Sequence, residues 1–406
     1  MKSKRSKMTA VSFLGNLRRL ILKALLSVFL RVLPLFIKRE AKMILFASYN
    51  GKSTGDSPGA IFEALHADPA YADYQLVWAL KKPRPVVGAE VVRFNSLAYY
   101  KALTKAKYWV FNAKMAPYYY KAEDQVYLQT WHGTPLKRLA HDIEDTGKRY
   151  RAYLTHKQMV KSYAEDSRHW DWLIASSPFT VEKFASAFQF PPDKMIQMPY
   201  PRTDILYQPK PEQIEQLRAH YQLPLDKKVI LYAPTWRDDA YGLDGYHMRL
   251  QLDFAHWKAV LGEQYVVLFK PHYLISNHIR IDEELKDFIY PLPATLDIHE
   301  AYLMADVLVT DYSSVFFDYA ILKRPIYFYM YDLELYSQHL RGFYLDVHKD
   351  LPSTPIQTEK ELLAALLENN FDYARLADFN QRFNPWVKGS SSLKIIEKIF
   401  KECKES

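Results

Sequence analysis

Short apolar runs alternate with longer segments of helical periodicity from about residue 43 onward, and this alternation constrains the fold more than any other feature. Apolar runs of strand length separated by helical segments are typical of βαβ units, whose parallel strands are buried between helices. Nine runs are expected to form strands, namely residues 43–48, 75–80, 108–111, 126–129, 173–175, 229–233, 265–269, 307–310 and 326–329. The sequence therefore predicts an α/β fold built on parallel sheet.

The chain is long enough for two domains. Its 406 residues exceed what one hydrophobic core usually serves, and a composition of 49% hydrophobic and 25% charged residues is typical of a globular protein. Residues 198–204 are rich in proline and turn formers, and a helical segment follows at residues 211–221. We therefore expect one domain at residues 43–205 and a second at residues 206–385.

Polar residues follow five of the predicted strands directly. These stretches are residues 130–137, 176–180, 234–238, 270–272 and 311–314. Open α/β sheets bind their ligands at the carboxyl ends of the strands. Five such stretches in two domains predict one ligand cleft between the domains.

The stretch at residues 308–319 reads as a buried strand that runs into a polar turn and then a helix. Ser313 or Ser314 is expected to be the N-cap of that helix, whose first backbone N–H groups would then favour an anion. Asp318 lies on the second turn, within reach of a hydroxyl of the same ligand. An ordinary capped βα unit is the alternative interpretation of these residues.

Several common chemistries are not indicated. The sequence contains no G-x-G-x-x-G, no H-E-x-x-H and no G-x-S-x-G, and the Gly51-Lys52-Ser53 triplet lacks the earlier glycine of a Walker A loop. We therefore expect no metal and no cofactor. The single cysteine, Cys403, excludes a disulfide framework and fits a reducing compartment.

The remaining polar residues favour anion handling with a histidine base. His132 follows a predicted strand and precedes Gly133, which would let a ligand approach closely. An imidazole can accept a proton from an alcohol nucleophile. Arg202, Lys270 and His272, with the Ser313–Ser314 turn, would supply positive charge and donors to a pyrophosphate. A structural histidine beside Trp131 is the alternative for His132.

The basic charge belongs to the N-terminus. Residues 1–42 carry eleven Lys or Arg and one Glu, a net charge of +10, whereas the other 364 residues together carry −2. Nucleic acid is therefore not an expected partner. Apolar residues recur at helical spacing in this segment, but its longest uncharged runs, residues 8–17 and 24–30, have only ten and seven residues, too few to span a membrane. We expect a helix in the interface of an anionic inner leaflet; a mobile arm or a helix docked on the body is the alternative.

Five motifs together resemble the CDP-glycerol:glycerophosphotransferase family of wall teichoic acid synthesis, the Tag/Tar primases and polymerases. They are residues 131–137 (WHGTPLK), 232–237 (YAPTWR), 270–272 (KPH), 310–318 (TDYSSVFFD) and 341–344 (RGFY). The sequence departs from the family at residues 351–356, where a Pro-Gly-Pro-like turn is usual, and at residues 386–390, where an Asp-Gly-Lys-like stretch is common. These departures leave the donor, rather than the reaction class, open.

The resemblance implies a GT-B-like fold of two Rossmann-like domains facing a cleft, a C-terminal helix at residues 386–406, and the amphipathic membrane segment at residues 1–42. It implies that His132 is the base on the acceptor hydroxyl and that His272 contacts the donor phosphates or assists the same step. The implied CDP-alditol site consists of His132, Gly133, Thr134, Pro135, Leu136, Arg202, Thr235, Trp236, Lys270, Pro271, His272, Ser313, Ser314 and Asp318.

The implied reaction transfers glycerol phosphate or ribitol phosphate from CDP-glycerol or CDP-ribitol to a lipid-linked disaccharide or polymer acceptor, with release of CMP. The implied location is the cytoplasmic side of the cell membrane, as a peripheral protein, and the oligomeric state is left open, a homo-oligomer included. The absence of a large extra domain favours a primase or short-chain transferase. Two alternatives are a nucleotide-sugar-dependent GT-B glycosyltransferase and a catalytically idle scaffold, the latter disfavoured because His132 and His272 are both intact.

Overall fold

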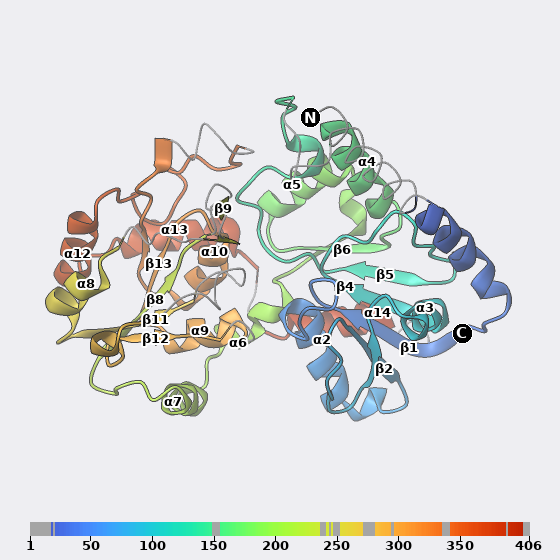
Figure 1. The fold of residues 1–406 in the computed structure, drawn as a ribbon, viewed down its shortest axis with the longest axis horizontal. Coiled ribbons are helices and arrows are strands. Elements are labelled where there is room, and N and C mark those ends of the chain that lie inside the picture. The colour runs from blue at the N-terminus through green and yellow to red at the C-terminus, as the bar shows by residue number, and fades with distance from the viewer. Residues whose placement is uncertain are drawn as a thin grey trace, which may run out of the picture. The chain divides into compact units, whose positions relative to one another are not determined.

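The computed structural model describes residue 18 and residues 21–147, 155–235, 241–242, 245–246, 252–270, 281–293, 296–334, 342–386 and 389–400 (Figure 1). Its first sheet has seven strands in the order β3-β2-β1-β4-β5-β6-β7, and the strand pairs from β3 to β6 are parallel. The strands are β1 (Glu40–Ala47), β2 (Gln75–Leu80), β3 (Glu90–Arg93), β4 (Ala106–Phe111), β5 (Val126–Gln129), β6 (Trp172–Ala175) and β7 (Met195–Gln197).

Three of the four described α-helices between these strands begin at a side-chain cap, whereas the first begins after Gly55 without one. Ser96, Thr155 and Ser177 each accept a backbone N–H of the first turn that follows, and Thr155 belongs to a full capping box. The helices are α2 (Asp56–Ala67), α3 (Leu97–Lys105), α4 (His156–Ser167) and α5 (Pro178–Phe188).

The second sheet has five parallel strands in the order β12-β11-β8-β13-β14. They are β8 (Lys228–Ala233), β11 (Tyr265–Phe269), β12 (Ile289–Pro291), β13 (Val307–Thr310) and β14 (Ile326–Phe328), and a separate antiparallel pair joins β9 (Tyr241–Gly242) to β10 (Gly245–Tyr246). Residues of β8, β11 and β13 are almost all buried in one aromatic-rich core. The helices of this half are α6 (Asp204–Tyr207), α7 (Pro211–His220), α8 (Phe254–Leu261), α9 (Ile298–Met304), α10 (Val315–Tyr319), α12 (Glu359–Glu368) and α13 (Tyr373–Phe383). The last helix, α14 (Ser391–Phe400), ends against the first half, where the Tyr74 hydroxyl donates to the Phe400 carbonyl at 3.2 Å.

The predicted α/β architecture is confirmed as two parallel sheets with helices between the strands, consistent with a GT-B-like fold. All nine predicted strands are present within a few residues of their expected bounds. The prediction missed β3, β7 and β12, which are only three or four residues long. Length alone is not the reason, since β5, β6, β13 and β14 are equally short. β3, β7 and β12 lie at sheet edges and bury only one or two residues each, so they lack a continuous apolar run.

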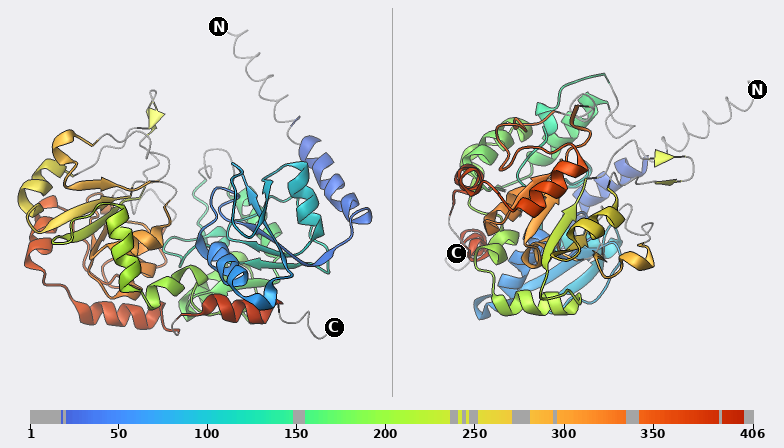
Figure 2. Two further views of the ribbon diagram at one scale, coloured as in Figure 1. Left: turned by 90° about the horizontal axis from the view of Figure 1, so that it is seen from below. Right: turned by 90° about the vertical axis from the view of Figure 1, so that its left-hand side faces the viewer.

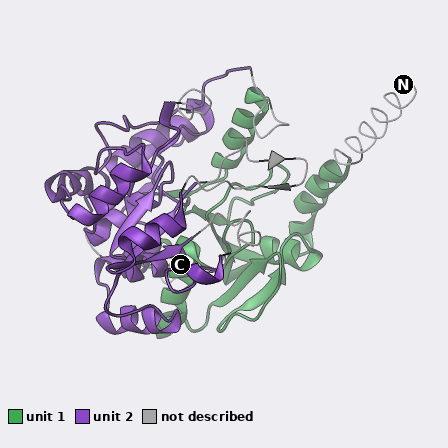
Figure 3. Cartoon of the chain, turned by 60° about the vertical axis from the view of Figure 1, so that its left-hand side comes forward, with its two compact units in different colours: residues 1–131, 149–173, 396–406 green, residues 132–148, 174–395 purple. Residues whose placement is uncertain are grey.

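The contacts divide the chain into two compact units (Figure 3). Unit 1 comprises Met1–Trp131, Arg149–Leu173 and Ile396–Ser406, and unit 2 comprises His132–Lys148 and Ile174–Ile395. Unit 2 thus contains two segments that precede the domain boundary predicted near residue 205. The predicted domain limits stay predictions.

Residues 21–32 form a helix in unit 1, shown in blue in Figure 2. Leu30 is buried, but Leu25 and Val28 are 62% and 59% exposed, and most other apolar side chains of the segment are exposed as well. Within the described part of the chain, no helix combines the length and the apolar character that crossing a bilayer requires. The predicted interfacial membrane helix stays a prediction.

Candidate functional site

The segment that carries His132 leaves the first sheet through a sharp turn. Trp131 has a φ of +54°, in the left-handed region that bulky residues seldom adopt, and its N–H donates to Gln129 Oε1 at 3.0 Å. His132 follows with an exposed side chain and is the first residue of unit 2. Strained backbone of this kind is often found beside functional groups.

The residues after His132 are fixed within unit 2 by backbone pairing. The N–H of Tyr344 donates to the Leu136 carbonyl at 2.9 Å, and Lys137 forms an antiparallel bridge with Phe343. Two motifs that are more than 200 residues apart, WHGTPLK and RGFY, are therefore neighbours. The second of them supports the loop that carries the first.

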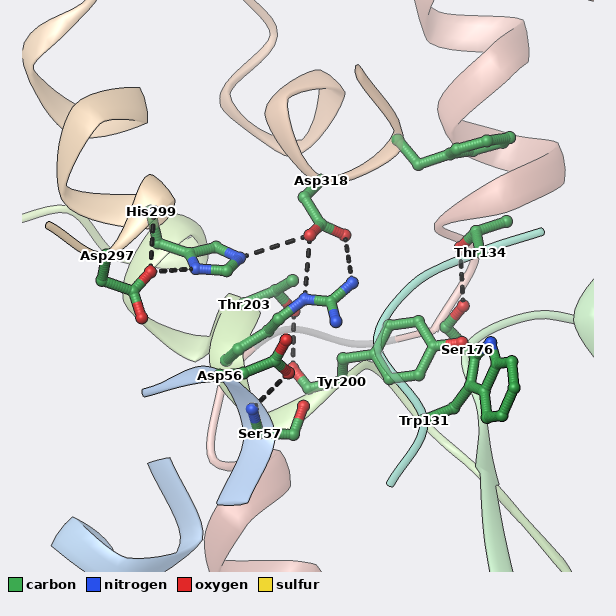
Figure 4. A network of polar contacts seen from close by, with 12 residues as sticks. Asp56, Ser57, Trp131, Thr134, Ser176, Tyr200, Thr203, Asp297, His299 and Asp318 are labelled. Carbon is green, nitrogen blue, oxygen red and sulfur yellow. Dashed lines mark hydrogen bonds and ion pairs between the residues drawn. The ribbon is translucent and has the colours of Figure 1, made fainter. Parts of the chain in front are cut away.

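Thr134, Pro135 and Leu136 are buried. The Thr134 hydroxyl lies 3.1 Å from the Ser176 hydroxyl, as Figure 4 shows, so it anchors the loop to the residues that follow β6. Because Thr134 is buried and contacts Ser176, its role in unit 2 is to hold this loop in place.

Gly133 lies against two other predicted site residues. Its φ is +149°, and a Cβ added to it would lie 3.4 Å from Ser314 Oγ and 3.5 Å from Arg202 Nη2. All three residues belong to unit 2. They come from three separate segments of the sequence, which were expected to share one ligand site and which lie side by side in the structure. A side chain at position 133 would fill the space that these groups share.

Ser314 occupies the N-cap position of α10, as expected, but its side chain makes no capping hydrogen bond. Its hydroxyl lies near Gly133 instead. Both Ser313 and Ser314 are half-buried. The helix itself is only five residues long and continues as a 3₁₀ turn at Ala320–Leu322.

Asp318 lies in α10 and is buried with its two oxygens engaged. Arg202 donates to it through Nε at 2.9 Å and through Nη2 at 3.3 Å, while His299 Nε2 lies 3.2 Å from Oδ2. Burial alone would raise the pKa of Asp318, but the neighbouring Arg202 and His299 lower it. Asp318 was expected to face a ligand hydroxyl, and in this structure it holds the Arg202 guanidinium.

Arg202 comes from the 3₁₀ turn Pro201–Thr203, inside the proline-rich segment, and stacks on Tyr200 with 4.5 Å between the guanidinium carbon and the ring centroid. A planar guanidinium held by a bidentate carboxylate and an aromatic face has little rotational freedom. This fixed cation is the group best suited to a phosphate beside Gly133.

Thr235 follows β8, and its hydroxyl and backbone N–H both donate to Asp311 Oδ1 at 2.8 Å. Asp311 follows β13 and is buried. This carboxylate therefore ties together the loops at the ends of two neighbouring strands. Asp311 lies in the TDYSSVFFD motif, but the sequence alone did not predict this structural role.

Lys270 follows β11, is half-buried, and donates through Nζ to the carbonyls of Pro293 at 2.5 Å and Leu296 at 3.0 Å. Burial lowers the pKa of Lys270 to about 8, although Asp297 and Glu300 act in the opposite direction. Trp236, Pro271 and His272 lie outside the described residues. Within the described part of the chain, no group of three or more His, Cys, Asp or Glu side chains could hold a metal ion.

Asp297 and His299 were not expected at the site from the sequence, and they join it through Asp318 (Figure 4). Asp297 caps α9 by accepting the His299 N–H at 2.9 Å. The only sequence signal was an Asp two residues before a His at a helix start, and nothing in that pattern points to residue 318.

A family described as CDP-Glycerol:Poly(glycerophosphate) glycerophosphotransferase matches residues 29–401. A teichoic acid poly(glycerol phosphate) polymerase of Bacillus spizizenii is 36% identical over 389 residues, which are 94% of this chain and 97% of that protein. A polymerase of the same description from Staphylococcus epidermidis is 41% identical over 90% of this chain, which spans about half (51%) of the relative's length.

The structure of the wall teichoic acid polymerase TagF superposes with a TM-score of 0.86 at 36% identity, over 97% of both chains. The predicted resemblance is confirmed by sequence and by fold. With its WHGTPLK and TDYSSVFFD motifs meeting at Gly133 and Ser314, this chain belongs to the CDP-glycerol:poly(glycerophosphate) glycerophosphotransferase family.

Proposed function

We propose that this chain transfers glycerol phosphate from CDP-glycerol to a hydroxyl of an acceptor in teichoic acid synthesis and releases CMP. The observation that carries the proposal is the meeting of Gly133, Ser314 and Arg202 in unit 2, at the two most distinctive motifs of the family. This meeting provides a backbone without a side chain, a hydroxyl and a fixed cation in one place. Such groups bind a diphosphate by donating hydrogen bonds to its oxygens and by balancing their negative charge.

His132 is the proposed general base. It adjoins Gly133 and is exposed, so an acceptor hydroxyl can reach it. Removing the proton as the oxygen attacks the β-phosphorus makes the acceptor a better nucleophile, while the bond to the CMP oxygen breaks. Arg202 and Ser314 would stabilise the charge that develops on the phosphoryl oxygens.

The finer assignments belong to the same proposal. The acceptor is a lipid-linked, undecaprenyl-pyrophosphate disaccharide or a growing polymer. CDP-glycerol is favoured over CDP-ribitol because the relatives described above are named for poly(glycerol phosphate). A TagF structure soaked with CDPG supports this choice of donor by analogy.

Donor choice tests the proposal directly. Purified full-length chain is offered CDP-glycerol, CDP-ribitol or a UDP-sugar together with a lipid-linked disaccharide acceptor, and the products are identified by mass. We expect CMP release and an acceptor extended by glycerol phosphate. Turnover of the UDP-sugar with no CMP from CDP-glycerol would support the alternative, a nucleotide-sugar-dependent glycosyltransferase.

Gly133→Ala is expected to lower CMP release by about 10–100-fold, because displacing reacting groups by less than 1 Å can cost this much. Alanine at φ +149° is strained, and its Cβ would occupy the space beside Ser314 Oγ and Arg202 Nη2, at 3.4 and 3.5 Å. Gly147→Ala is the matched control, since Gly147 also has a positive φ (+71°) in unit 2 but a Cβ there would meet no atom within 4 Å. Equal turnover by the two variants would contradict the role of the space beside Gly133.

We also propose that the protein attaches peripherally to the cytoplasmic face of the cell membrane. The described helix of residues 21–32 exposes most of its apolar side chains beside basic residues such as Lys23 and Arg31. Apolar area and positive charge together favour the interface of an anionic bilayer.

Replacing Leu25 and Val28 together by glutamate is expected to weaken sedimentation with anionic vesicles by about tenfold or more, because two apolar contacts are lost and two repulsive charges appear. The control variant replaces Val87 and Leu225 by glutamate instead. Both residues lie outside this helix, and they are 84% and 79% exposed. The control variant should sediment like the unmodified protein. Equal loss in both variants would show that general acidity, rather than this helix, decides attachment.

A further inference from the structure

A row of four charged side chains in unit 2 ends at Arg202, whose Nη2 lies near Gly133. Figure 4 labels the other three, Asp297, His299 and Asp318. Asp297 Oδ1 lies 2.6 Å from His299 Nδ1, His299 Nε2 lies 3.2 Å from Asp318 Oδ2, and Asp318 pairs with Arg202 through two contacts of 2.9 and 3.3 Å. The side chains of Arg202, His299 and Asp318 are 5%, 6% and 9% exposed. Three buried ionisable groups in contact are costly unless their charges balance.

The charges balance when His299 carries a proton. Burial alone would lower the pKa of His299, but Asp297 and Asp318 on its two sides raise it to about 9. The ring is therefore an imidazolium at neutral pH, which donates from both nitrogens. Two cations and two carboxylates then alternate along the row.

Other titratable groups face these four side chains. The Tyr302 ring packs edge-on against His299 with 5.3 Å between the ring centroids, and Asp318 contributes to the raised pKa of Tyr207, although burial is the larger cause.

Glu300 and Lys270 also face the row. Glu300 follows His299 on α9, and burial together with Asp297 raises its pKa. Lys270, at the end of β11, interacts with Asp297 and Glu300. The row of charged side chains therefore has a predicted donor-site residue at each end. Lys270 lies near Asp297 at one end, and Arg202 lies beside Gly133 at the other.

Without His299, the Asp318 carboxylate would lose one hydrogen-bond donor, and its plane would no longer be fixed. A carboxylate that pairs bidentately fixes the plane of the guanidinium only while its own plane is fixed. His299 supplies that constraint on Oδ2, and Asp297 in turn fixes the imidazole through Nδ1. Arg202 Nη2 is the atom that faces the Gly133 backbone at the end of this row.

We propose that His299, held by Asp297, is a positioning residue that fixes the Asp318–Arg202 pair, so that the guanidinium meets the pyrophosphate of the CDP-alditol beside Gly133. The inference rests on the proposed function and deepens it. His299 touches no substrate. It acts through Asp318 on the affinity for the donor diphosphate.

Steady-state kinetics of the full chain with CDP-glycerol tests this role. His299→Gln should raise KM for CDP-glycerol about tenfold and change kcat less than about threefold, because the guanidinium binds the diphosphate in both the ground state and the transition state. His256→Gln, at an exposed histidine of α8, should leave both constants unchanged. An unchanged KM in a folded His299→Gln variant would overturn the proposal.

The pH profile gives a signature that a merely structural role would not produce. KM of the unmodified protein should rise as pH passes about 9, where His299 loses its proton. Asp297→Asn keeps an acceptor for Nδ1 and a good helix cap but removes one charge, so the rise in KM should move to lower pH. This variant also serves if His299→Gln does not fold, and a rise at the same pH as in the unmodified protein would overturn the proposal.

The two proposals fail differently. No CMP release from CDP-glycerol by the unmodified protein would refute the proposed function. Normal CMP release with a KM insensitive to His299 and Asp297 would refute only the positioning role.

Discussion

Replacing His132 by alanine is expected to lower CMP release from CDP-glycerol by about 10²–10⁴-fold, the usual contribution of a general base. The imidazole is exposed at the start of unit 2 and adjoins Gly133, whose missing side chain leaves room for a ligand beside Ser314. Affinity for CDP-glycerol should change little, because Arg202 and Ser314 remain in place. Turnover and equilibrium binding are measured on the same preparation.

His348→Ala is the control for this experiment, because His348 is also exposed in unit 2. It should keep normal turnover. CMP release near that of the unmodified protein in His132→Ala would remove the general-base assignment, and loss of donor binding would indicate a binding role instead.

Arg202→Met is expected to destabilise the protein by about 3–5 kcal/mol, because it leaves the buried Asp318 carboxylate without its main partner. The double variant Arg202→Met with Asp318→Asn should recover part of this loss, since the remaining charges of Asp297 and His299 again balance. Turnover should stay low in both variants, because the guanidinium is absent from both. Denaturant unfolding measures the loss of stability and its partial recovery. CMP release measures turnover.

The matched control is Arg382→Met, which removes one partner of an exposed ion pair with Asp350 in the same unit. Exposed pairs contribute about 0–1 kcal/mol, so this variant should unfold almost like the unmodified protein. Equal destabilisation by the two substitutions would contradict the assignment of Arg202 to a buried pair. Recovery of turnover in the double variant would contradict its role at the diphosphate.

The strands could be predicted because each one is a compact apolar run whose burial depends on local composition. β2, β5, β11 and β13 have the bounds that the sequence predicted. β12, in contrast, has three residues and ends in Pro291, so its identity depends on pairing with β11 rather than on its own sequence. Tertiary pairing of this kind has no local signal.

Gly133 and Ser314 lie in the polar stretches that follow two predicted strands, whereas Arg202 lies in the proline-rich segment at residues 198–204. Gly133, Ser314 and Arg202 were expected at one ligand site, and the structure brings them together in unit 2. The partner of Arg202 could not be predicted, because Asp318 is 116 residues away and its contact arises only when β13 and the 3₁₀ turn at Pro201–Thr203 are in place. Likewise, Ser314 has the sequence of a capping serine, but its hydroxyl is turned towards Gly133.

The pairing of Arg202 with Asp318 has a consequence for dissecting the molecule. A polypeptide cut at residue 205 would put the guanidinium and the glycine on one fragment, and the carboxylate and the serine on the other. Neither fragment would retain the contacts of Arg202 with Asp318 and of Gly133 with Ser314, because unit 2 contains segments from both sides of the cut. A binding module isolated from this enzyme must therefore include residues 132–148 and begin its main segment no later than residue 174.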